Sequence, residues 1–177
     1  MANNANVDYL FIGTEEQVNK LETLCKGIKN ELTMEDIVTS FGINANTISV
    51  YGEAQTYIRK NPNTIEINFI CAWDWQRDFY NTMKTFFSEV YFTCEEMGYG
   101  VYECNTFTHF ECNIRYVLDG EYHEYFETLD EVKNYLIDDI NGIETATTAE
   151  EINTLVEQYS TTNNVDLRFY EYTLITE

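Results

Sequence analysis

Hydrophobic and polar residues follow two periods along the chain, and together these periods predict a mixed α+β fold. The clearest strand covers 64–73, where apolar side chains from Ile65 to Cys71 alternate with Glu66 and Asn68. Further strands are predicted over 7–12, 47–50, 91–96, 99–105, 110–118, 122–127 and 165–175. Asp119-Gly120 between alternating segments predicts a hairpin.

Helix starts are predicted from capping residues that precede apolar stripes. The capping-box spacing occurs at Thr14 with Gln17, Thr128 with Glu131, and Thr148 with Glu151. Thr33 and Asp36 predict a short helix that closes at Gly42. Asp74 is expected to cap a helix whose apolar stripe runs from Phe79 to Val90.

The order of predicted elements through Glu96 matches the β-α-β-β-α-β unit of ferredoxin-like folds. We therefore expect a ferredoxin-like core with an antiparallel sheet, extended by β-hairpins and two C-terminal helices. Residues 1–127 are assigned to this domain and its hairpin extension. Residues 128–177 are expected to add helices and a strand that pack on it in one compact unit.

Charge is the second distinctive property of the sequence, with 31 acidic and 10 basic residues and a net charge of −21. Residues 1–88 carry −4 and residues 89–177 carry −17. Because such a chain repels phosphates, we expect no direct binding of nucleic acid and none of membranes. An aromatic content of 15% nevertheless favours a folded chain over a disordered one.

Localisation and redox state follow from the N-terminus and the cysteines. The first residues lack the basic and apolar regions of a secretory leader, so a cytoplasmic protein is expected. The five cysteines are odd in number and lie in apolar patterns without a C-x-x-C pair, which favours reduced, buried thiols. No cofactor is indicated.

A family resemblance is carried by segments 7–24, 65–75 and 90–102. Their features are a strand-to-helix step, a strand that ends in Trp and an acidic glycine-containing turn, at Gly13-Thr14-Glu15-Glu16, Ala72-Trp73 and Glu95-Glu96-Met97-Gly98-Tyr99-Gly100. Residues 7–125 thus resemble the YubB-type ferredoxin-like domain of uncharacterised phage and plasmid proteins. The resemblance implies a fold and a phage or mobile-element setting, and it transfers no catalytic residue.

Candidate chemistry is weak in this sequence, and we expect a protein that is not an enzyme. Cys94, Cys104 and Cys112 with His109 offer zinc-ligand types, but their mid-strand positions favour core thiols. The enzymatic alternative is a hydrolase with an unrecognised Cys or carboxylate site. Another alternative is a structural protein that self-associates through an edge strand.

The leading hypothesis is a non-catalytic acidic binding protein that occludes a basic, nucleic-acid-binding surface of a partner protein. A solvated acidic face that only maintains solubility explains the same charges. An exposed Trp at the end of the clearest strand is a further candidate contact residue. The candidate binding residues are Trp75, Glu121, Glu124, Glu127, Asp130, Glu131, Asp138 and Asp139.

Overall fold

The computed structural model describes residues 3–27, 31–98, 100–110 and 113–176. These residues divide into two compact units, Met1–Thr106 with Ile175–Glu177 as the first and Phe107–Leu174 as the second. Each unit has its own cluster of buried apolar side chains. The predicted division after Glu127 differs from this one, because the two strands over 116–126 belong to the second unit with the helices that follow.

An antiparallel sheet with the order β2-β3-β1-β4-β5 forms the base of the first unit. Its strands are β1 (Asn4–Ile12), β2 (Gly52–Asn61), β3 (Thr64–Ala72), β4 (Glu89–Glu96) and β5 (Val101–Cys104). In β3, Ile65, Ile67 and Phe69 are buried, whereas Glu66 and Asn68 are partly exposed. The predicted alternation of the clearest strand, and the mixed α+β class, are therefore confirmed.

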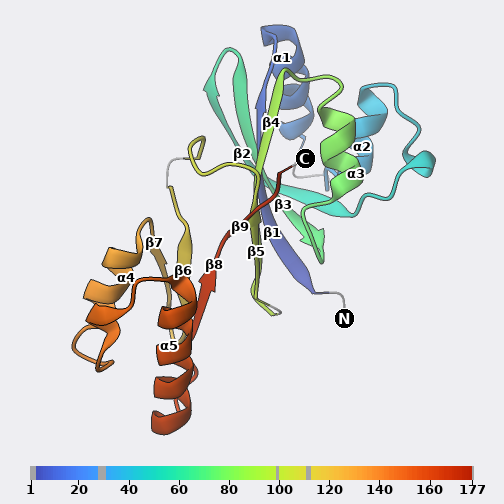
Figure 1. Ribbon diagram of the computed structural model, residues 1–177. Coiled ribbons are helices and arrows are strands. Elements are labelled where there is room, and N and C mark those ends of the chain that lie inside the picture. Colours follow the sequence, from blue (N-terminus) through green and yellow to red (C-terminus); the bar gives the residue numbers. More distant parts are fainter. Residues whose placement is uncertain (1–2, 28–30, 99, 111–112, 177) are drawn as a thin grey trace. The chain divides into compact units, whose positions relative to one another are not determined.

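Helices α1 (Glu15–Cys25), α2 (Met34–Ser40) and α3 (Arg77–Met83) lie on one side of this sheet (Figure 1). Their apolar faces and the inward side chains of β1 and β3 form one core. Tyr9 lies within this core, and its ring centroid is 5.2–6.0 Å from those of Phe11, Phe69, Phe79 and Phe92. Aromatic packing at these separations is favourable beyond the area that it buries.

Four of the five predicted capping residues, all of them threonines, begin their helices as expected. Thr14 caps α1 and Thr33 caps α2, each with a reciprocal bond from the third helical residue. In the second unit, Thr128 and Thr148 form the same capping boxes at α4 (Leu129–Leu136) and α5 (Ala149–Asn163). Local hydrogen bonds thus fix these helix starts wherever the sequence supplies the pair.

The strand predicted at 47–50 is wrong. The segment η2 (Ala45–Thr47) is a 3-10 turn, because the Asn44 side chain accepts from the Asn46 backbone N–H at 3.1 Å and redirects the chain. The strand forms instead at β2, which pairs with β3 on one edge of the sheet. Most side chains of β2 are exposed or half-buried, so the strand has no hydrophobic alternation to predict it.

The predicted start and length of the helix after β3 are also wrong. Gln76, not Asp74, is the residue before α3, and it has a left-handed φ of 60°. The Asp74 carboxylate instead accepts the Gln76 backbone N–H at 2.7 Å. The helix ends at Met83, and Val90 belongs to β4, where it pairs with Phe11.

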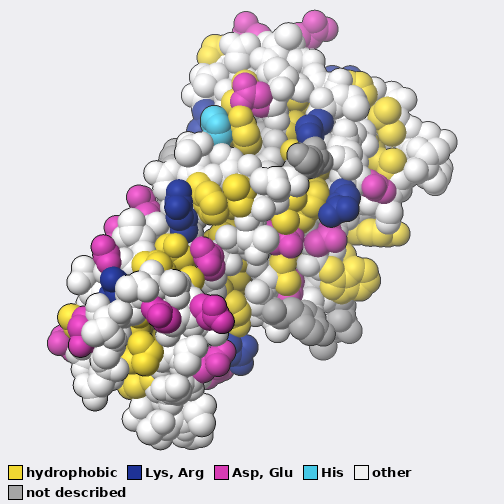
Figure 2. All heavy atoms as spheres, viewed as in Figure 1, with side chains coloured by type: hydrophobic (Ala, Val, Ile, Leu, Met, Phe, Trp, Pro, Cys, Tyr) yellow, Lys and Arg dark blue, Asp and Glu magenta, His cyan; other side chains and the backbone are white. Residues whose placement is uncertain are grey.

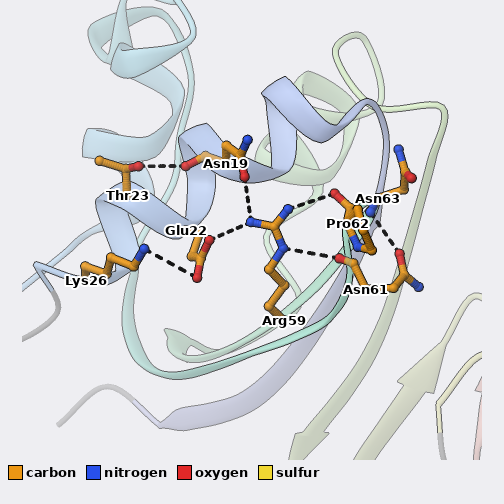
Figure 3. A network of polar contacts seen from close by, with 8 residues as sticks. All are labelled: Asn19, Glu22, Thr23, Lys26, Arg59, Asn61, Pro62 and Asn63. Atoms are coloured by element: carbon orange, nitrogen blue, oxygen red, sulfur yellow. Dashed lines mark hydrogen bonds and ion pairs between the residues drawn. The ribbon is translucent and has the colours of Figure 1, made fainter.

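Arg59 of β2 ties the sheet to α1 (Figure 3). One of its terminal nitrogens donates to Asn19 and to Glu22, each at 2.6 Å, and the other donates to the carbonyl of Pro62 at 3.0 Å. The bond from Arg59 lowers the pKa of the Glu22 carboxyl below its ordinary value. A planar guanidinium can satisfy several acceptors at once, so this side chain anchors the helix on the edge strand.

The second unit packs α4, α5 and the 3-10 turn η3 (Ile143–Thr145) around the sheet β7-β6-β8 (Figure 1). Its strands are β6 (Tyr116–Asp119), β7 (His123–Phe126) and β8 (Arg168–Glu171), and the short β9 (Thr173–Leu174) follows. Asp119 pairs with His123 across the turn, which confirms the hairpin predicted at Asp119-Gly120. The strand predicted at 110–118 begins later, at Tyr116, and residues 111–112 lie outside the described ranges.

Candidate functional site

The second unit carries most of the excess negative charge. Residues 107–174 hold fifteen acidic and three basic side chains, a formal charge of −12, compared with −9 for the remainder of the chain. The candidate acids of this unit are exposed, except for half-buried Glu124. Their carboxylates are therefore at the surface, where they set the electrostatic potential that a partner meets.

Some candidate acids stabilise the fold of the unit itself. The Glu131 carboxylate accepts backbone N–H groups of Glu127 at 2.9 Å and Thr128 at 3.3 Å, which completes the cap of α4. Asp130 forms an ion pair with Lys133 at 2.6 Å. Because these carboxylates already have partners, Glu131 and Asp130 are weaker candidates for binding than the sequence suggested.

Other acids meet at a groove. Its volume is about 530 Å³, and its lining consists of Gly120, Glu121, Tyr135, Leu136, Asp139, Tyr159, Val165, Asp166 and Leu167. Glu121 comes from the β6–β7 turn, Asp139 from the segment after α4, and Asp166 from the segment before β8. On the face shown in Figure 2, carboxylates (magenta) surround apolar side chains (yellow) over the second unit.

The groove combines apolar and acidic surface. Tyr135 is 53% exposed and Val165 is 44% exposed, so apolar surface is accessible beside the carboxylates. Asp166 also pairs with Arg168 at 3.1 Å, which leaves Glu121 and Asp139 as the stronger negative groups. Lys and Arg side chains match this arrangement, because an apolar stem precedes their charged head.

Glu124, Glu127 and Asp138 do not line this groove. Asp166 does line the groove, although it is not among the candidate residues predicted from the sequence. Those candidate acids come from the stretch 119–157, which holds twelve acidic residues and one basic residue, and Asp166 lies beyond it. The sequence does indicate a chain reversal before Asp166, because Asn163-Asn164 is a typical helix end. In the structure Asn164 follows α5 with a left-handed φ of 54°, and the chain turns there toward β8.

Trp75 is not a surface residue, contrary to the prediction. It is 5% exposed, and its ring stacks on Phe92 with centroids 4.4 Å apart. The Tyr9 hydroxyl donates to the backbone carbonyl of Trp75. Trp73 is the exposed tryptophan of the pair, because its left-handed φ of 71° breaks the strand alternation after Ala72.

The cysteines of the described part are buried free thiols, as predicted: Cys25, Cys71, Cys94 and Cys104. Burial raises the pKa of the Cys25 thiol to about 12, and it also raises the pKa values of Cys71 and Cys94. Cys94 pairs with Glu103, and Cys104 pairs with Thr93, so the two thiols point to opposite faces of the sheet. Cys112, the third candidate zinc ligand, lies outside the described ranges.

Asp8 of β1 is the carboxyl that best fits the hydrolase alternative, because such a site needs a desolvated acid. Burial raises the pKa of its carboxyl above the ordinary value, although a bond from Asn68 at 2.9 Å opposes the shift. Asp8 pairs with Thr93, and Thr93 pairs with Cys104 on the far side, so one strand separates this acid from that thiol. Cys94 faces the helix-covered core instead.

Asp8→Asn is expected to raise the melting temperature at pH 7. The folded chain binds the Asp8 proton more tightly than the unfolded chain, so the ionised carboxylate destabilises the fold at neutral pH. This penalty disappears as the pH falls through the raised pKa toward the ordinary value of 3.8. Thermal unfolding of the variant and the wild type at decreasing pH should give a shrinking difference, and Asp138→Asn controls for loss of one charge. A variant that is less stable at pH 7 would contradict this.

Comparisons of the chain with protein-family models, with curated proteins and with solved structures returned no significant match. Within the described ranges, the structure has no helix that is long and apolar enough to cross a membrane. The same ranges hold no cluster of three His, Cys, Asp or Glu side chains that could bind a metal ion.

Proposed function

We propose that this chain is a non-catalytic acidic binding protein of phage or mobile-element type, which occludes a basic, nucleic-acid-binding surface of a partner protein. The proposal includes a ferredoxin-like core of the YubB type in the first unit. The element order and the antiparallel order β2-β3-β1-β4 support that core. Cytoplasmic action is part of the proposal, and the free thiols in the described part support it.

The observation that carries the proposal is the groove of the second unit. Glu121, Asp139 and Asp166 come from separate segments and meet beside exposed apolar surface in a unit with a charge of −12. A surface that evolved to neutralise phosphates presents Lys and Arg side chains, which attract carboxylates in the same way. The apolar lining adds contacts that phosphates do not offer, so the groove can compete with nucleic acid for such a surface.

The distant acids have a different role in this proposal. Fixed carboxylates around the groove accelerate the approach of a basic partner, and this effect weakens as salt screens the charges. Acids in the groove make direct contacts and mainly determine how long the complex lasts. Removing the same number of charges at the two places should therefore have unequal effects.

The test compares the triple variant Glu121→Gln/Asp139→Asn/Asp166→Asn with the control Glu144→Gln/Glu157→Gln/Glu171→Gln, whose residues are exposed and do not line the groove. Each protein is immobilised, loaded with bacterial lysate in about 50 mM NaCl, and eluted with duplex DNA or with about 500 mM NaCl. We expect retained nucleic-acid-binding proteins that duplex DNA displaces. Retention should fall about fivefold or more in the groove variant and about twofold or less in the control.

Two results would contradict the proposal. Failure of the wild type to retain any basic protein at low salt would exclude occlusion of such a surface. Equal losses in the groove variant and its control would show that only overall charge matters. Far-ultraviolet circular dichroism of each variant establishes that the fold is retained in the comparison.

A further inference from the structure

An exposed pair of aromatic residues marks a surface in the first unit, distinct from the groove of the second. Tyr51 is 59% exposed and precedes β2, while Trp73 is 60% exposed and follows β3. The two positions lie at the same end of the β2–β3 pair, because the Ala72 backbone N–H donates to the Tyr51 carbonyl at 2.9 Å. Exposed Trp and Tyr side chains are enriched where proteins make contacts.

The backbone that carries these aromatics is held by hydrogen bonds, two of them from the buried Gln76 side chain. Gln76 is buried, its side-chain oxygen accepts the Tyr51 N–H at 2.9 Å, and its side-chain nitrogen donates to the Ala72 carbonyl at 2.8 Å. The Trp73 N–H donates to the Asn3 carbonyl at 3.0 Å. Because the backbone at Tyr51 and Trp73 is already ordered, a ligand loses less entropy in ordering it than on a free loop.

A cavity of about 480 Å³ is lined by Tyr51 and by Ala72, the residue that precedes Trp73. Its lining consists of Asn4, Thr33, Glu35, Val50, Tyr51, Gly52, Glu53, Ile70, Cys71 and Ala72. Glu35 and Glu53 are exposed acids, whereas Val50 and Cys71 are buried and apolar. The cavity thus offers negative charge at its surface, an aromatic ring at its side and apolar surface below.

We propose that this surface binds an arginine-bearing segment of a partner protein. The guanidinium fits the chemistry, since it stacks on Trp and Tyr rings and forms bidentate pairs with carboxylates. Glu35 and Glu53 provide the charge complementarity, and the cavity receives an apolar neighbour of the arginine. An acidic segment is repelled by the same residues. This inference concerns the first unit and does not rest on the occlusion proposed for the second.

The two tryptophans of the chain make the test specific, because Trp73 is exposed and Trp75 is buried. The probe is the blocked peptide Ala-Leu-Arg-Leu-Ala, and its control replaces arginine with citrulline, which has the same shape without the charge. Binding to the full chain is followed by the indole N–H signals in proton–nitrogen correlation spectra. We expect the Trp73 signal to shift with a dissociation constant about tenfold lower for the arginine peptide, while the Trp75 signal stays in place.

Variants separate the contributions of the rings and the charges. Trp73→Phe and Glu35→Gln/Glu53→Gln should each weaken binding about fivefold or more, whereas Ile58→Ala and Glu15→Gln/Glu16→Gln should change it less than about twofold. Ile58 is an exposed apolar residue of β2, and Glu15 and Glu16 lie in the first turn of α1 as Glu35 does in α2. An unchanged Trp75 signal reports that each variant is folded.

Several outcomes would overturn the inference: no shift of the Trp73 signal at millimolar peptide, equal binding of the citrulline peptide, or full binding by Trp73→Phe. The groove variant Glu121→Gln/Asp139→Asn/Asp166→Asn distinguishes the two sites. If the groove variant abolishes the Trp73 shift while Glu35→Gln/Glu53→Gln leaves it unchanged, the peptide binds in the second unit and the inference is wrong. If it binds the peptide normally, the first-unit surface is independent of the proposed function.

Discussion

Trp75→Ala should lower the free energy of unfolding of the first unit by about 3–5 kcal/mol, whereas Trp73→Ala should change it by less than about 0.5 kcal/mol. The rings differ in burial: Trp75 stacks on Phe92 and meets Tyr80 edge-to-face at 5.5 Å, whereas Trp73 is mostly in water. Removing the buried ring leaves a cavity between aromatic neighbours that cannot fully collapse.

Urea denaturation of the two variants and the wild type gives the comparison, with circular dichroism as the signal. The mutation pair is its own control, since the residues are two positions apart and the side chains are identical. A loss of stability in Trp73→Ala as large as that in Trp75→Ala would contradict the assignment of the buried and exposed tryptophans. It would also remove the basis for the aromatic surface of the first unit.

Ile152→Ala should destabilise the second unit by about 2–5 kcal/mol and leave the first unit protected. Ile152 of α5 is fully buried among Val132, Leu136 and Val156, in a core that belongs to the second unit alone. Because each unit has its own core, we expect each to open separately.

Amide hydrogen exchange measured by mass spectrometry tests this prediction. Peptides from α4 and α5 should lose protection in Ile152→Ala, and peptides from β1 and β3 should keep it. The reciprocal variant Phe79→Ala, which truncates the core of the first unit, should reverse the pattern. Parallel loss of protection in both units after either mutation would show that they unfold as one.

The fold was predictable from the sequence where local chemistry or two-residue alternation determines it. The Thr–Gln, Thr–Asp and Thr–Glu caps begin α1, α2, α4 and α5 because these bonds form within a single turn. β3 was predictable because its two faces differ in burial. β2 was not, since it lies at an edge and gains its order from pairing with β3 rather than from its own pattern.

The candidate site was predictable in its charge and not in its geometry. Counting acids located the excess in the second half of the chain, and two nominated residues, Glu121 and Asp139, line the groove. The count could not reveal that Glu131 is used in a cap or that Asp166 joins the groove after a chain reversal. Trp75 was wrongly predicted to be exposed because the strand alternation ends at Trp73, which has a left-handed φ. Glycine is the residue that usually marks such a conformation in a sequence, and Trp73 is not a glycine.

The most direct test of the account is a map of where a basic ligand binds. Titrating the labelled full chain with a nona-arginine peptide in about 50 mM NaCl should shift the amide signals of Gly120, Glu121, Asp139, Asp166 and Leu167 first and most strongly. About 500 mM NaCl should reduce those shifts. Equal shifts at every exposed acid of the second unit, including Glu144 and Glu157, would contradict the account, because the carboxylates would then act only as a diffuse charge.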